Sequence, residues 1–588
     1  MTEHGNAVHV VRVKSSHVTK QGETRNYLTS YLRRSWREGR QVHKETIANL
    51  SALPDHVIES IIAGLRGEQL VPAHARATVA RSVPHGHVAA VWAQAQALGL
   101  PALLGPASRA RDLVMALIIA RVCKPGSKLA ATRWWQDTTL AADLGVATAS
   151  TDEVYASLDW LAGRQEDIEK KLARKNLNPG VNPHRLALFD LSSCWVTGEH
   201  CDLAKRGCSR DGKKGLPQIE YGLLTDPDGR PVAIRVVPGN TADPKAFEQI
   251  AIEMKTTFGL EEMVMVGDRG MITSARIDQL RQLGGLGWVS ALRAVQITAL
   301  MAGNGPVQQT LFDQTNLAEI SHPDYPGERL IACRNPALAA KRAHKRDQLL
   351  AATETDLVKI AAAVQAGRLT QAGPIGVRVG KVVGKYNMAK HFHLTIDDGQ
   401  FTYTRNQAAI DAEAALDGIY IIRTCVPDTQ MDAATVVATY KSLAHVERDF
   451  RSLKSIDLDL RPTYHFTDTR VRAHVFLCML AAHLVWHLRK AWAPLTYTDE
   501  HRPDPVNPVA PAKRSRAAQL KASTHTTHAG EPVYSFTGLL NHLATLTRND
   551  IRYGADPHTP TIPTLATPTT IQRQAFELLG RPIPIGLK

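Results

Sequence analysis

The chain has 588 residues, 44% hydrophobic and 21% charged, which excludes a disordered chain by composition and is too long for one ordinary domain. Its 70 Lys and Arg residues exceed its 56 Asp and Glu residues, giving a net charge of +14. Such an excess favours polyanionic partners, because basic groups release counterions from phosphate backbones, although many basic proteins bind no nucleic acid.

Cysteine usage and hydropathy bear on where the protein acts. The seven cysteines are scattered and odd in number, which argues for a reducing compartment and against a disulfide framework. Residues 1–16 lack an apolar signal core. The longest apolar stretch, residues 475–488, is interrupted by His483 and His487 and is too short to cross a bilayer. We therefore expect a cytoplasmic protein with no membrane partner.

Residues 1–53 form a basic segment in which nine Lys or Arg residues stand against four Glu within the first 50 residues. Runs such as HVVRV and YLTSYLRRSW predict strands. The segment is either a solvated β-hairpin or a DNA-contacting module, and both interpretations stay open. Residues 54–180 have apolar residues at helical spacing, which predicts a helical region for DNA binding or dimerisation.

The pattern changes at residue 181. RLALFDLSSCWV, EYGLLTD and PVAIRVVPG predict three strands, and DPDG predicts a turn between the second and third. A helix over residues 243–258, a short buried strand ending at Asp268, a helix over residues 274–283 and the strand GLGWVSAL follow. This order predicts an α/β domain over residues 181–293 with an antiparallel opening.

Residues 294–430 are predicted to be an α+β insertion, because a strong helix of the α/β domain resumes after them. Asn335–Pro336 begins a long helix that runs to Gly367. Strands are predicted for GVRVGKVVG and GIYIIRT, and a hairpin for HFHLTI and FTYTR around Asp398–Gly399. Residues 431–495 complete the α/β domain, and residues 496–588 are a linker followed by an extension with one helix.

Two acids occupy notable positions in the predicted strands. Asp190 lies inside an apolar run, where a carboxylate is costly unless its charge is compensated. Asp268 ends the run VMVGD, and acids at strand ends suit a hard cation. Each acid alone is more simply a strand-end or turn aspartate.

The predicted helix over residues 432–454 is amphipathic. At 100° per residue, Tyr440, Glu447, Arg451 and Lys454 lie within a stripe of about 80° beside the apolar face. Glu447 is then partly shielded from water. Such a helix can hold a metal and grip phosphates, whereas the simpler alternative is a surface helix with pairs such as Glu447–Arg451.

Together these residues resemble the DDE transposases of bacterial insertion sequences, in the subgroup with a β-rich insertion and a Tyr-x2-Arg-x3-Glu-x6-Lys helix. Tyr440, Glu447 and Lys454 stand at the motif spacings, whereas Leu443 occupies the arginine position, for which Arg448 or Arg451 would substitute. Stretches such as GDRGM, PGNTADP and RAHVFLCMLA are also family-like. The resemblance covers residues 180–495.

The resemblance implies an RNase H-like catalytic domain, a mixed five-stranded sheet with helices. In it Asp190, Asp268 and Glu447 would bind two Mg²⁺ ions, with Mn²⁺ able to substitute. Tyr440, Arg448, Arg451 and Lys454 would contact DNA. The reaction would be strand cleavage at element ends and strand transfer into target DNA.

The implied partners are double-stranded DNA, as terminal inverted repeats and target, and a second copy of the chain, at the bacterial nucleoid. Two alternatives stay open: a stand-alone nuclease of the same fold, which cuts without joining, and a catalytically silent DNA-binding remnant. A glycosidase with paired carboxylates is disfavoured, because only 6% of residues are aromatic and the net charge suits an anionic substrate.

Overall fold

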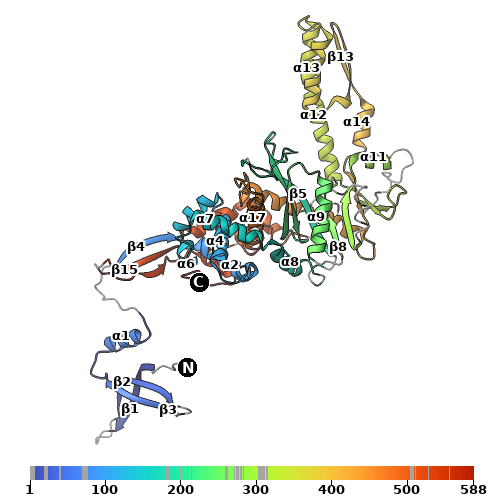
Figure 1. The fold of residues 1–588 in the computed structure, drawn as a ribbon. Helices are drawn as coiled ribbons and strands as arrows, with labels where there is room; N and C mark the ends of the chain where they lie inside the picture. Colours follow the sequence, from blue (N-terminus) through green and yellow to red (C-terminus); the bar gives the residue numbers. More distant parts are fainter. Residues whose placement is uncertain are drawn as a thin grey trace. The chain divides into compact units, whose positions relative to one another are not determined.

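The computed structural model divides the chain into two compact units, Met1–Ser82 with Asn549–Thr564 and Val83–Arg548 with Leu565–Lys588 (Figure 1). It describes residues 7–18, 24–38, 41–68, 77–178, 180, 182, 185–198, 200–207, 209–213, 215–258, 262–269, 272, 277, 281, 284–301, 312, 316–503, 509, 512–527, 529–554 and 557–588. The helix predicted for residues 274–283 lies almost entirely outside these ranges.

The first unit contains the basic N-terminal segment. The strands β1 (Ala7–Val18), β2 (Thr24–Glu38) and β3 (Gln41–Asn49) form an antiparallel sheet, so the strands predicted here are confirmed, and α1 (Asp55–Leu65) follows. The expectation of helices throughout residues 54–180 is wrong at β4, because a pairing between distant parts of the chain leaves no local signal. A second sheet comprises β4 (Ala77–Pro84), β15 (Thr547–Tyr553) and β16 (Ile562–Leu565).

The second unit begins with helices whose starts follow local capping rules. Ser108, Ser127 and Ser150 each accept a hydrogen bond from a backbone amide in the first turn, and Ser150 forms a capping box with Glu153. The helices are α2 (Gly86–Ala97), α3 (Leu100–Leu104), α4 (Arg109–Cys123), α5 (Lys128–Gln136), α6 (Leu140–Leu144), α7 (Thr151–Ala162) and α8 (Gln165–Asn176).

A mixed sheet of eight strands, counted over the described residues, forms the centre of the second unit in the order β10-β11-β14-β9-β8-β5-β6-β7. β5, β6 and β7 pair antiparallel, and β8 and β9 run parallel to β5. The strands are β5 (Leu186–Trp195), β6 (Gln218–Thr225), β7 (Pro231–Pro238), β8 (Met263–Val266), β9 (Leu286–Ala291), β10 (Leu317–Ile320), β11 (Arg329–Arg334) and β14 (Ile419–Thr424).

The five strands predicted between residues 181 and 293 are confirmed, as is the helix α9 (Asp243–Phe258). The sheet is nevertheless wider than the five strands expected. β10, β11 and β14 extend it antiparallel beyond β9, and they come from the segment assigned to the insertion. The short helix α11 (Ala294–Met301) precedes them.

The remainder of the insertion forms a helical arm with its own apolar core (Figure 1). The strand predicted for GVRVGKVVG is wrong, because this segment lies in α13. Ile375, Val379 and Val383 recur every four residues and are buried, so packing against α12 selects the helix over the apparent alternation. The hairpin around Asp398–Gly399 is confirmed. The arm comprises α12 (Pro336–Gln365), α13 (Ala372–Lys385), β12 (Phe392–Asp397), β13 (Gln400–Arg405) and α14 (Gln407–Ala414).

Helix α17 (Asp468–Ala491) lies in the main core, packed against α4, α7 and β7. Within the described ranges it is the one helix long and apolar enough to cross a membrane, and 83% of its apolar window is buried inside the protein. Its hydropathy is therefore accounted for by core packing. Residues 496–530, expected to be a linker, contain α18 (Arg516–Thr524), and α19 (Phe536–Ala544) and α20 (Thr570–Leu578) follow.

A buried ion pair ties β14 to the chain before β11. Arg423 donates two hydrogen bonds of 2.6 Å to the carboxylate of Glu328, and both side chains are 3% exposed. We predict that Glu328→Ala lowers the free energy of unfolding by about 3–5 kcal/mol, because it removes the carboxylate that compensates a buried guanidinium. Urea unfolding measures the change.

The control for this prediction is Glu319→Ala, whose carboxylate is 39% exposed beside Arg329. It should cost less than about 1 kcal/mol, since exposed ion pairs contribute little. Equal losses for the two variants would contradict the importance of the buried pair.

Candidate active site

Two acids lie at the same end of neighbouring parallel strands. β5 and β8 pair with Leu188 opposite Val266, and Asp190 and Asp268 each stand two residues further along. Because adjacent strands are about 4.8 Å apart, this register brings the two acids to neighbouring positions. The hydroxyl of Ser290 on β9 donates to the Asp268 carbonyl at 3.3 Å and fixes the backbone there.

Asp190 is half-buried and Asp268 is exposed. Burial raises the pKa of Asp190 to about 6, with the charges of Asp268 and Glu447 acting in the same direction, while the Leu191 amide and Arg210 oppose the shift. The Leu191 amide donates to Asp190 Oδ1 at 2.8 Å. The charges of the other two predicted acids therefore both act on Asp190.

Glu447 comes from a helix that is shorter than predicted. Residues 432–454 form α15 (Ala433–Lys441) and α16 (Leu443–Arg451), separated at Ser442, and then a π-helical turn, Ser452–Ile456. α16 packs on β5 and β6 through Val446 and Phe450, and the Phe450 ring meets Tyr221 edge-on at 5.6 Å. Glu447 is exposed. The prediction that the apolar face shields it is wrong, because the angular count assumes one unbroken helix.

Tyr440 on α15 contacts the second acid. Its hydroxyl donates to Asp268 Oδ1 at 3.3 Å. Burial raises the pKa of Tyr440, and the charges of Asp268 and Glu447 raise it as well. The phenol therefore stays protonated at neutral pH and serves as a hydrogen-bond donor. Sequence reasoning assigned Tyr440 to DNA, whereas the structure places it against a carboxylate.

Lys454 belongs to a charged cluster beside the end of β5. Its Nζ donates to Asp211 Oδ1 at 2.8 Å, and Arg461 donates to the same oxygen. The Asp211 side chain is 2% exposed and that of Lys454 12% exposed. Arg461 and Lys213 both lie over the Trp195 ring, at 5.3 and 5.6 Å from its centroid. The predicted phosphate-contacting lysine is thus held in place by a buried carboxylate.

The arginines lie differently from the sequence expectation. Leu443, at the motif arginine position, is partly buried against the core. Burial lowers the pKa of Arg448, which lies among Asp449, Arg451, Arg489 and Arg502. Arg451 is exposed on α16.

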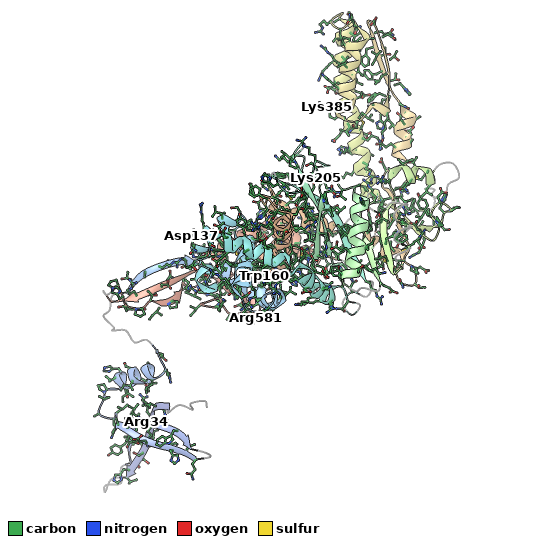
Figure 2. All side chains as sticks on the ribbon, viewed as in Figure 1. Arg34, Asp137, Trp160, Lys205, Lys385 and Arg581 are labelled. Atoms are coloured by element: carbon green, nitrogen blue, oxygen red, sulfur yellow. The ribbon has the colours of Figure 1, made fainter. Side chains whose placement is uncertain are left out.

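Arg210 is the arginine whose charge acts on Asp190. Its amide donates to Ser193 Oγ at 3.0 Å, and its guanidinium donates to the Leu191 carbonyl, so it is fastened to β5. Sequence reasoning missed it. The available signal was the basic run of residues 203–213 directly after the strand that carries Asp190, which includes Lys205 (Figure 2).

The three acids suit a hard divalent cation by chemistry. An all-oxygen ligand set favours Mg²⁺ or Mn²⁺, and a cation would relieve the repulsion felt by Asp190. Within the described part of the chain, no group of three or more His, Cys, Asp or Glu side chains is close enough to hold one metal ion. Coordination therefore requires the exposed side chains of Asp268 and Glu447 to turn toward Asp190, a rotamer change that exposed residues make rapidly.

Comparisons with known proteins agree with this geometry. A family model described as the transposase DDE domain matches residues 192–484, a range that contains Asp268 and Glu447 and begins two residues after Asp190. No curated protein matches the chain significantly. Among solved structures, the cryo-EM structure of a piggyBac transposase synaptic complex with hairpin DNA is similar at 9% identity and a TM-score of 0.32, over 78% of this chain and 76% of that one.

The raised pKa of Asp190 makes a prediction about stability. A carboxyl whose pKa is higher in the folded than in the unfolded protein destabilises the fold once it ionises. Asp190→Asn should therefore raise the free energy of unfolding at pH 7 by up to about 3 kcal/mol. The gain should shrink below about pH 6 and vanish near pH 4, as unfolding by urea across this pH range would show.

Asp397→Asn, an exposed site on the β12–β13 hairpin, is the control. It should change the free energy of unfolding by less than about 0.5 kcal/mol at any pH. A gain for Asp190→Asn that is the same at pH 4 and pH 7 would refute the assignment.

Proposed function

We propose, because this chain belongs through residues 192–484 to the DDE transposase family, that it cleaves double-stranded DNA at the ends of a mobile element and joins the strands to target DNA. The observation that carries the proposal is the meeting of three acids. Asp190 and Asp268 are in register on parallel strands, and the charge of Glu447 on α16 acts on Asp190.

An RNase H-like catalytic domain is part of this proposal. The order β7-β6-β5-β8-β9, with the first three strands antiparallel and β8 and β9 parallel to β5, supports it. In this arrangement Asp190 lies on the first strand of the domain, Asp268 follows the fourth, and Glu447 lies on a later helix.

Asp190, Asp268 and Glu447 would hold two divalent ions, Mg²⁺ or Mn²⁺. When bound, such ions lower the pKa of the attacking water or 3′-hydroxyl and stabilise the leaving oxygen. DDE transposases generally depend on divalent metals, and the donor set here is consistent with that dependence.

The other residues bind and orient. Tyr440 donates to Asp268 and restrains that carboxylate. Arg210, beside Asp190, would contact the scissile strand in place of the arginine missing at Leu443. Lys454, positioned by Asp211, would contact backbone phosphate, and the exposed Arg451 and partly buried Arg448 would contact DNA further along α16.

The substrates would be terminal inverted repeats and target DNA in the bacterial cytoplasm. A homodimer is proposed on the DNA complex, because two element ends require two active sites. A nuclease without joining activity is the alternative within the same fold. Supplying a pre-cleaved 3′-hydroxyl end separates the two, since only a transposase transfers it to a second duplex.

We predict that Glu447→Gln lowers the rate of metal-dependent DNA strand cleavage by at least about a hundred-fold, the scale of losing one electrostatic contact to a transition state. DNA affinity in EDTA should be retained. Gel assays with duplexes that carry the DNA flanking the gene, with magnesium or manganese, measure the rate.

Asp397→Gln is the matched control, since it removes an exposed carboxylate on the helical arm. Its cleavage rate should equal that of the wild type. Cleavage by Glu447→Gln at the wild-type rate would overturn the proposal, and absence of cleavage by the wild type would favour a silent DNA-binding protein.

A further inference from the structure

The N-terminal sheet has one covered face. Directly opposed residues of antiparallel strands share a face, so Arg12 of β1 lies on the same face as Ser30 of β2. Ser30 is 3% exposed, and its amide donates to Ser51 Oγ at 2.9 Å. Arg12 donates to Glu59 of α1 at 2.8 Å. The helix α1 and the chain around Ser51 therefore cover this face.

The other face is open and carries aromatic rings and cations. Tyr27, Tyr31 and Arg33 alternate along β2 on this face, and the Arg33 guanidinium lies 5.2 Å from the centroid of the Tyr31 ring. Tyr27 is 50% exposed. Lys44 of β3 lies opposite Ser35 on the same face and is exposed.

Negative charge is confined to the covered side. Glu45 of β3 lies opposite Arg34 on that face, 3.7 Å from its guanidinium. Asp55 and Glu59 of α1 both lie within ion-pair distance of Arg12. Among the side chains that the structure describes on the three strands, those of the open face are neutral or basic. Cations on the covered face are thus neutralised internally, and those on the open face are directed outward.

We propose that this open face binds double-stranded DNA. Charge complementarity indicates a polyanion, and the choice of duplex DNA rests on the proposed function. Three strands span about 10 Å between the outer backbones, which is close to the width of about 12 Å of the DNA major groove. Sheets are known to read DNA from within a groove. Arg33 and Lys44 would contact phosphates, and the tyrosines would contact sugars, bases or phosphate oxygens.

The test compares two double variants of the full-length chain that remove the same charge from opposite faces. Arg33→Gln with Lys44→Gln alters the open face, and Lys14→Gln with Arg34→Gln alters the covered one. Affinity for a fluorescein-labelled duplex is measured by anisotropy over a salt series in EDTA. Because metal is absent, this measurement does not depend on cleavage, whose failure Glu447→Gln would reveal separately.

The open-face pair should lower affinity about ten-fold or more and reduce the slope of log affinity against log salt by about two, one for each phosphate contact. The covered-face pair should lower affinity less than about two-fold, through screened long-range charge. Tyr27→Ser, which changes no charge, should also weaken binding and is a second test should the double variant unfold.

Three results would overturn the proposal. Equal weakening by both pairs would mean that net charge, and not this face, governs binding. An unchanged salt slope for the open-face pair would mean that Arg33 and Lys44 meet no phosphate. Tighter binding of single-stranded RNA than of duplex DNA, lost with the open-face pair, would assign the face to another nucleic acid.

Discussion

The parallel pairing of β5 with β8 is the constraint on which the candidate site depends. Backbone hydrogen bonds set Leu188 beside Val266, and the next residues on the same faces are Asp190 and Asp268. α16 is packed on β5 through Val446 and Phe450, which brings the charge of Glu447 to the same place. Like charges so gathered raise the pKa of the half-buried Asp190. The fold thus holds an unfavourable arrangement of charge that a cation would relieve, which is expected of a site built for function and not for stability.

Around the acids, the fold separates cations that are held from cations that are exposed. Asp211 is buried and takes hydrogen bonds from Lys454 and Arg461, so these two are fixed in position by an internal counter-ion. Arg210 is exposed but fastened to β5 through its amide. The N-terminal sheet follows the same principle, with Glu45 turned to the face that α1 covers. A strong positive charge on the chain is therefore directed at surfaces where a phosphate backbone could lie.

Several features were predictable because their signals are local. Apolar runs specified the strands that carry Asp190 and Asp268, and Pro244 and periodicity specified α9. Other features misled for equally local reasons. Valine alternating with basic residues in α13 resembles a strand, and nothing in residues 432–454 marks the break at Ser442. The arm's core and the packing of α15 and α16 on different strands override these patterns.

By itself the sequence determined which residue types stand on which elements, since hydrophobic periodicity and capping act within a few residues of the chain. It thereby supplied the three acids, Tyr440 and Lys454 as a set. Tertiary structure alone decided the register that makes Asp190 a neighbour of Asp268, the exposure of Glu447, the place of Arg210 beside Asp190, and the joining of β10, β11 and β14 to the central sheet. These depend on hydrogen bonds and packing between segments far apart in the chain, whose pairing energies no local pattern contains.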